Sequence, residues 1–245
     1  RGLTDEVANL IQTLEQRGFA VEQLAAIREQ MQQVVGAASG KQAATLNDWL
    51  PTEFVREDFQ IQDVRLTSSQ LILLDQQADR VMEVGLDTKN AKITAGKAQL
   101  GEALQIDKYD NKLYILNSDG LSIAAGEQVQ QISAADPEWG NVYDLAVFSG
   151  NIYVLSETNI WKYPAIENGY GSKQKWIEDT QNPVSQARHI MIDGYVWLAE
   201  NTEIRKFTRG IEDNFKLTGL EDPITSITSF YTDEKSKFIY ILESS

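Results

Sequence analysis

Short apolar runs separated by polar turn residues recur along most of the chain. Five of these runs share one pattern, in which aliphatic and aromatic residues follow one another without strict alternation until an acidic or polar residue ends the run. Continuous apolar runs of this length are typical of strands that are buried on both faces. The pattern therefore predicts five equivalent interior strands: LILLDQ from Leu71, LYILNS from Leu113, IYVLSE from Ile152, YVWLAE from Tyr195 and IYILES from Ile239.

The five runs recur at a nearly constant spacing. The leucine that closes each run marks its position, and successive markers lie about 40 to 45 residues apart, which is the period of a four-stranded propeller blade. A β-sandwich is the alternative, but it predicts no fixed period. We therefore predict a mainly β protein: a β-propeller with about five visible blades that is part of a six- or seven-bladed one. The markers are Leu74, Leu116, Leu155, Leu198 and Leu242.

The segments around the markers complete the predicted blade. An apolar strand precedes the marker, a tight turn such as Ser149-Gly150-Asn151 or Asp193-Gly194 joins the two, and Gly and Asn suit such a turn because they tolerate positive φ. A third and a more ragged fourth strand follow. The examples are DLAVF from Asp144 and RHIMI from Arg188 as first strands, NIWKYP from Asn159 and EIRKFT from Glu203 as third strands, and Lys175 to Ile177 and Phe215 to Leu217 as fourth strands.

The stretches HIMIDGYVWL from His189 and IRKFTRG from Ile204 resemble the repeats of NHL, YVTN and SMP-30-like β-propellers. The resemblance covers residues 59–245 and concerns the architecture rather than one functional family, because no WD dipeptide and no kelch double glycine occurs. Propellers of this class usually have six or seven blades. The resemblance thus implies that the C-terminal blade is incomplete, with one or two further blades beyond Ser245.

The N-terminal part follows a different, helical pattern. Residues 1–36 are predicted to form a helix or a helical hairpin with a heptad-like apolar seam, and Gly18 could divide it. Residues 37–58 read as a linker. A coiled coil through which the protein self-associates is the alternative, but Arg17 and Arg28 interrupt the seam and favour a hairpin. The seam residues are Leu3, Val7, Leu10, Leu14, Val21, Leu24, Met31 and Val35.

Charge and composition exclude several classes of partner. The chain has 36 acidic and 22 basic residues and a net charge of -14, which repels nucleic-acid phosphates and anionic lipid head groups. We therefore expect no nucleic-acid binding and no membrane contact by this region itself. No cysteine occurs, so thiolate sites and disulfides are excluded. We expect a fragment of a larger multidomain protein whose compartment is open, an extracytoplasmic part included.

Three aspartates fall on or near the first strands of successive repeats, which line the central channel of a propeller. Asp63, Asp107 and Asp144 could together ligate calcium, a cation that prefers six to eight oxygen ligands. Gln105, Arg188 and Ser226 occupy similar places in the repeats and would give a mixed ring, so solvated turn acids are the favoured interpretation. We expect no cofactor, with calcium as the alternative.

Two further features are candidates for a contact with a ligand. His189 is the only histidine and follows Arg188 in a predicted strand, where a structural role is more common than a catalytic one. Aromatic residues, Tyr170 among them, could stack on sugar rings. Most of them fall in strand patterns, as Trp161 and Trp197 do, whereas Trp139 lies in the loop DPEWG and is the predicted exposed contact.

These observations favour a non-catalytic module that binds a protein or a small-molecule ligand, because a clear scaffold carries no assembled reactive group of residues. Helix-plus-propeller layouts resemble the sensor or interaction parts of multidomain bacterial proteins. The alternative is a calcium-dependent hydrolase or lactonase, as in SMP-30-like propellers. Fold alone does not decide between these functions.

Overall fold

The computed structural model describes residues 7, 10–15, 17–19, 23–28, 30, 49–50, 59–75, 77, 79–177, 183–220 and 222–244. The chain divides into two compact units, Arg1–Trp49 with Gly219–Asp222, and Leu50–Thr218 with Pro223–Ser245. Most of the predicted linker, and seam residues Leu3, Val21, Met31 and Val35, lie outside the described residues. No helix in the described ranges is long and apolar enough to cross a membrane.

The second unit is built from successive antiparallel sheets, and its first four sheets have four strands each. A short hairpin, whose two strands have two residues each, is inserted in the third sheet. The fifth sheet has two strands. The sheets are β1 (Ile61–Leu66), β2 (Gln70–Asp75), β3 (Arg80–Gly85) and β4 (Ala91–Ala95); β5 (Ala103–Tyr109), β6 (Lys112–Asn117), β7 (Gly120–Ala125) and β8 (Gln128–Ala134); β9 (Val142–Phe148), β10 (Asn151–Ser156), β11 (Ile160–Tyr163) and β14 (Gln174–Lys175), with the hairpin β12 (Ala165–Ile166) and β13 (Gly169–Tyr170); β15 (His189–Ile192), β16 (Val196–Ala199), β17 (Ile204–Thr208) and β18 (Ile211–Glu212); and β19 (Ile227–Tyr231) with β20 (Tyr240–Glu243).

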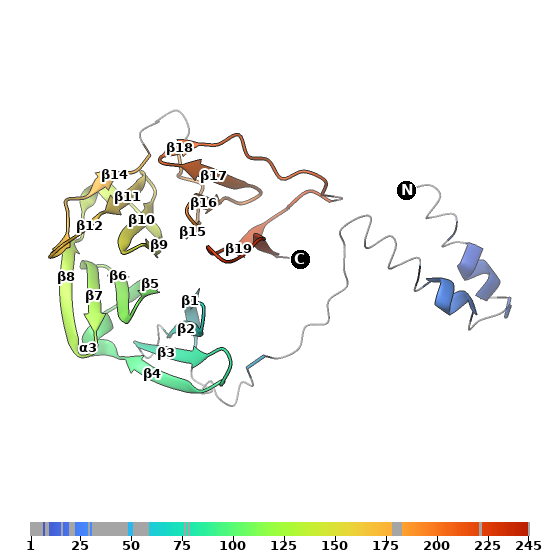
Figure 1. The fold of residues 1–245 in the computed structure, drawn as a ribbon, viewed down its shortest axis with the longest axis horizontal. Helices are drawn as coiled ribbons and strands as arrows, with labels where there is room; N and C mark the ends of the chain where they lie inside the picture. Colours follow the sequence, from blue (N-terminus) through green and yellow to red (C-terminus); the bar gives the residue numbers. More distant parts are fainter. Residues whose placement is uncertain are drawn as a thin grey trace. The chain divides into compact units, whose positions relative to one another are not determined.

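The sheets are arranged as the blades of a β-propeller, which confirms the predicted fold. Each sheet begins with its innermost strand, and β1, β5, β9, β15 and β19 lie around a common centre (Figure 1). Each innermost strand contacts that of the next blade. Two short helical segments join or flank the blades: α3 (Lys97–Leu100) and η2 (Pro137–Trp139).

The hydrophobic core consists of clusters between successive blades. Ile72 and Leu74 of the first blade pack with Ile106 and Ile115 of the second, and equivalent clusters join the second blade to the third, the third to the fourth and the fourth to the fifth. Four of the five marker leucines are at most 1% exposed, as predicted for strands buried on both faces. These are Leu74, Leu116, Leu155 and Leu198.

Two predictions about the later repeats are wrong. Leu242 is 62% exposed, because no further sheet of the described chain packs on its face of β20. Residues 215–217 do not form the fourth strand of the fourth blade; β18 takes that position. Phe215 instead packs edge-on against Trp197, with ring centroids 5.1 Å apart, so its side chain contributes to the core without a strand.

The first unit contains helical residues at 10–15 and 23–28, separated by a turn at residues 17–19. Gly18 has a φ of 74°, which agrees with the predicted division into two helices. Arg28 forms an ion pair of 2.6 Å with Glu15, linking the two segments as in a hairpin. Ile11 is buried and Leu10 is exposed, so the apolar face differs from the predicted seam. Self-association stays a prediction.

Candidate functional site

The three aspartates of the inner strands form links between blades. Each carboxylate accepts one hydrogen bond from the backbone amide of the residue that follows it, and its second oxygen accepts one from an amide of the next blade's inner strand. Asp63 and Asp144 are buried in the inner strands β1 and β9, so the expectation of solvated turn acids is wrong, and these hydrogen bonds satisfy their carboxylates within the protein. The inter-blade bonds are Ile106 N to Asp63 Oδ2 at 2.9 Å, Val147 N to Asp107 Oδ2 at 2.6 Å and Ile190 N to Asp144 Oδ2 at 2.8 Å.

Arg65 lies among these carboxylates and joins three blades. Its Nη2 pairs with Asp144 Oδ1 and lies 3.5 Å from Asp63 Oδ2, while its Nε donates to Ile106 O at 2.8 Å. Burial by itself would lower the pKa of Arg65, but the neighbouring carboxylates, Asp144 foremost, raise it above its ordinary value. Burial also raises the pKa of Asp107, to about 6. The inner strands therefore carry a buried cluster in which the Arg65 cation pairs with the carboxylates of Asp63 and Asp144.

This arrangement differs from a calcium site. Within the described ranges, no group of three or more His, Cys, Asp or Glu side chains is placed to hold a metal ion. Both oxygens of Asp63 and of Asp144 already accept hydrogen bonds. The position between these two carboxylates, where a cation would bind, is occupied by the guanidinium of Arg65.

Arg188 and His189 lie at the start of the fourth blade but do not form a reactive group with one another. The Arg188 guanidinium lies 4.1 Å from the ring centroid of Tyr143 and donates to the carbonyls of Ser185 and Ala187 at 2.8 Å each. The His189 side chain is 36% exposed, and its Nδ1 lies 3.9 Å from Asp144 Oδ2. The same oxygen accepts the hydrogen bond from Ile190 N. His189 therefore borders the cluster of Asp63, Arg65 and Asp144, whereas the hydrogen bonds of Arg188 are local.

The prediction that Trp139 is an exposed contact is wrong, since the residue is only 3% exposed. Asp136 accepts a hydrogen bond from Glu138 N and Pro137 begins the 3-10 turn η2, which directs Trp139 inward. There it packs edge-on against Tyr163, with ring centroids 6.4 Å apart. Trp161 and Trp197 are buried, as predicted.

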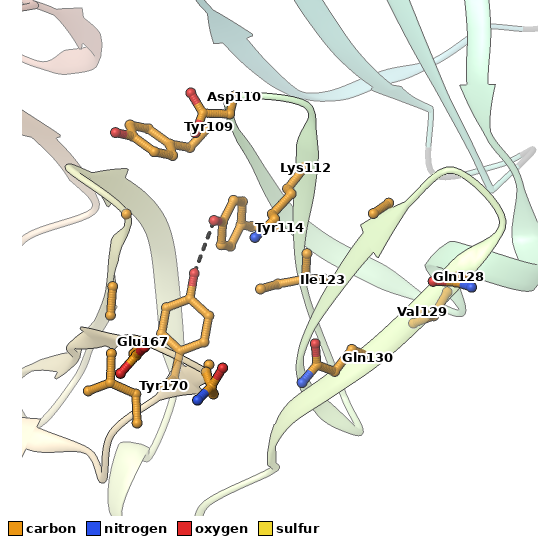
Figure 2. Close-up of a pocket in the computed structure, with 16 residues that line it drawn as sticks. Tyr109, Asp110, Lys112, Tyr114, Ile123, Gln128, Val129, Gln130, Glu167 and Tyr170 are labelled. Carbon is orange, nitrogen blue, oxygen red and sulfur yellow. Dashed lines mark hydrogen bonds between the residues drawn. The ribbon is translucent and has the colours of Figure 1, made fainter.

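A cavity of about 660 Å³ lies between the second and third blades (Figure 2). The second blade supplies the β5–β6 turn and the edge strand β8, and the third supplies the inserted hairpin β12–β13. Figure 2 shows Glu167 and Tyr170 on one side and Gln128, Val129 and Gln130 on the opposite strand. The cavity is therefore an inter-blade site, away from the central channel.

The hairpin that forms one wall is a departure from the repeat. The third and fourth strands of the second and fourth blades are joined by Gly126–Glu127 and by Arg209–Gly210, whereas residues 164–173 separate β11 from β14 in the third blade. Asn151 Oδ1 accepts a hydrogen bond of 3.1 Å from Ala165 N and fixes the start of the insertion. At its end, Lys173 pairs with Asp136 and with Glu138 at 2.6 Å.

A pair of tyrosine hydroxyls spans the cavity from one blade to the other. Tyr114 of β6 and Tyr170 of β13 meet with their hydroxyl oxygens 3.0 Å apart (Figure 2). Burial raises the pKa of Tyr114 and the contact with Tyr170 adds to the increase, so this phenol keeps its proton at neutral pH. Gly150, with a φ of 77°, lies at the same wall, and a Cβ there would meet Ala165 and Tyr109.

A second, smaller cavity of about 160 Å³ opens at one end of the central channel, where Asp107, Ile192 and Tyr231 of different blades meet. Of the inter-blade cavity's residues, the sequence singled out only Tyr170, as one of several aromatic residues. The signal that could have located this cavity is the long segment between the third and fourth strands of the third repeat, PAIENGYGSK, because a repeat that departs from its neighbours often carries function.

No family model and no curated protein sequence matches the chain. Among solved structures, it is similar to streptogramin B lyase at 13% identity, with a TM-score of 0.53 over 76% of this chain and 63% of that one. It is similar to virginiamycin B lyase from Staphylococcus aureus at 12% identity, with a TM-score of 0.52 over 77% and 65% of the two chains. A gluconolactonase of Xanthomonas campestris gives 12% identity and a TM-score of 0.51 over 71% and 65%.

The chain thus spans less than two thirds of the length of each of these structures. At such identities the similarity establishes the β-propeller fold alone, and it does not transfer the activities that the names of these enzymes carry.

Proposed function

We propose that this chain is a non-catalytic binding module of a larger multidomain protein, and that its ligand binds in the cavity between β8 and the hairpin β12–β13. The observation that carries the proposal is that the cavity exists because of an insertion anchored at both ends, at Ala165 by Asn151 and at Lys173 by Asp136 and Glu138. The second and fourth blades join their third and fourth strands by two residues each, so a four-stranded blade does not require such a segment.

The size of the cavity favours a small molecule over a protein partner. Ligand pockets are clefts of about 300–1,000 Å³, and the cavity of about 660 Å³ falls within this range. The charged residues of the channel support a non-catalytic reading, because Asp63, Arg65 and Asp144 form hydrogen bonds that join blades.

The proposal is tested by filling the cavity without disturbing the core. Ala165 lines the cavity and is exposed, so Ala165→Trp places a large side chain in it. Ala91, an exposed residue of β4, offers the same substitution outside the cavity as a matched control. A library of water-soluble metabolites is screened by saturation-transfer NMR. We expect compounds that bind the wild type and Ala91→Trp but not Ala165→Trp; equal binding by all three proteins would refute the proposal.

The hydrolase alternative has its own test. If calcium binds only the folded state, a free calcium concentration of 100 times the Kd raises the free energy of unfolding by about 2.7 kcal/mol. We expect the melting temperature to be the same with calcium and with a chelator, because the Arg65 guanidinium lies between the channel carboxylates. A calcium-dependent increase that Asp144→Ala abolishes would favour the enzyme.

A further inference from the structure

We infer that the ligand of the inter-blade cavity is an uncharged, hydroxyl-rich molecule, a short oligosaccharide. This inference rests on the proposed function, since it names the ligand class of the same cavity. Three observations carry it: the kind of polar groups that line the cavity, the lack of described partners for six of these side chains, and the small net charge of the lining.

The polar side chains around the cavity are free to bind a ligand. Six polar residues that line the cavity are exposed, and their side chains make no hydrogen bond or ion pair to another described residue. Asn151, a partly buried neighbour, does form such a contact, since its Oδ1 accepts a hydrogen bond from Ala165 N. The six are Asp110, Lys112, Gln128, Gln130, Glu167 and Asn168.

These groups both donate and accept hydrogen bonds. The amides of Gln128, Gln130 and Asn168 each offer an oxygen acceptor and two N–H donors. In the pair of Tyr114 and Tyr170, one hydroxyl donates to the other, so one O–H remains to donate to a ligand and lone pairs remain to accept. A sugar hydroxyl is itself both donor and acceptor, so it can use every one of these partners.

The charges around the cavity disfavour ionic ligands. Asp110 and Glu167 outnumber Lys112 on its lining, and the chain carries a net charge of -14, so an anion would be repelled. Lys112 lies beside Tyr114 on the lining (Figure 2), where its positive charge would repel the ammonium groups of a polyamine. The balance favours a neutral ligand.

An entirely apolar ligand is disfavoured because it would remove water from these polar groups without replacing their hydrogen bonds, which is costly. Some apolar contact is nevertheless offered, since Val129 is 45% exposed and Ile166 is 56% exposed on facing walls. A sugar ring combines C–H surface with hydroxyls, and Tyr109 and Tyr170 add aromatic surface for it.

The test uses saturation-transfer NMR with six probes: maltotriose, cellotriose, xylotriose and chitotriose, with spermidine and citrate as charged comparators. We expect transfer to at least one trisaccharide, and loss of that transfer with Ala165→Trp. Tyr170→Phe keeps the ring but removes one hydroxyl, so it should weaken binding roughly five- to tenfold, as expected for one lost hydrogen bond. The matched control is Tyr195→Phe, which makes the same change at an exposed site outside the cavity.

The outcomes separate the ligand class from the proposed function. Transfer only to spermidine or citrate, abolished by Ala165→Trp, would overturn the oligosaccharide and leave the binding cavity in place. No transfer to any trisaccharide would also overturn the inference. A trisaccharide that binds Ala165→Trp as it binds the wild type would overturn both. Unchanged affinity in Tyr170→Phe would exclude the hydroxyl pair from recognition and overturn the argument built on it.

Discussion

Asp144 links three blades, and its removal is expected to destabilise the propeller more than any exposed ion pair does. Its carboxylate accepts hydrogen bonds from Leu145 N of its own strand and from Ile190 N of the fourth blade, both at 2.8 Å. It also pairs with Arg65 of the first blade. The side chain is 2% exposed, so solvent does not screen these contacts.

The expected cost of Asp144→Ala follows from the charge that it leaves behind. Removing one partner of a buried ion pair costs about 3–5 kcal/mol, because the other charge stays buried without compensation. Arg65 keeps Asp63, at 3.5 Å, which moderates the loss, but the amide of Ile190 is left without its acceptor, which costs about 1–3 kcal/mol. We therefore expect a loss of about 4 kcal/mol, a large part of the 5–15 kcal/mol typical of a domain.

The measurement is equilibrium unfolding in urea, followed by tryptophan fluorescence, for wild type, Asp144→Ala and Lys97→Ala. Lys97 forms an exposed ion pair with Asp79, and its variant should unfold at the same urea concentration as the wild type. A double variant, Arg65→Met with Asp144→Leu, should be less destabilised than the sum of its single changes, because each change removes the charge that the other would leave without this partner. A loss under about 1 kcal/mol for Asp144→Ala, or strict additivity in the double variant, would refute this account of the channel.

Two further predictions concern backbone space and pH. Gly120→Ala should destabilise the protein strongly, because a Cβ there would lie 2.1 Å from Ser133 O. Gly126 has open space around it, so Gly126→Ala should lower the free energy of unfolding far less in the same urea assay. Equal losses of unfolding free energy in the two variants would contradict this. Asp107, with a pKa of about 6 in the folded state against about 4 in the unfolded chain, binds its proton more tightly when folded, so this group favours folding less as pH rises from about 4 to 6. The unfolding free energy of the wild type minus that of Asp107→Asn should therefore fall across this window, and a difference independent of pH would exclude the assignment.

The blade architecture could be predicted from the sequence because its physical cause is local. A sheet that is apolar on both faces must have a continuous apolar second strand, and Ile152 to Leu155 show this pattern in β10. The fourth strands of the third and fourth blades could not be predicted equally well, because β14 and β18 have only two residues each and so leave no apolar pattern in the sequence. Phe215 shows the error: its side chain is apolar because it packs on Trp197, while the backbone forms no strand.

The site could be predicted less well, because exposure depends on neighbouring blades rather than on the local sequence. Trp139 follows the loop residues Asp136 and Pro137, yet the ring of Tyr163 takes up one side of its indole. The sequence predicts that the three aspartates lie on inner strands, and they do, in β1, β5 and β9. Their hydrogen bonds to the amides of the next blade depend on a register that the sequence does not show.

The two groups of polar residues differ in a way that bears on function. The polar atoms of the channel are partnered: Arg65, Asp63 and Asp144 bind one another or the backbone, which is what burial requires of charged groups. Six exposed polar side chains around the inter-blade cavity, Gln130 and Glu167 among them, make no hydrogen bond or ion pair to another described residue. A group that already has its full set of hydrogen bonds gains little from a ligand, whereas a hydrated group on a preformed wall can exchange water for a ligand at low cost. Recognition is therefore expected where the third blade departs from the repeat, and the channel residues are expected to hold the blades together.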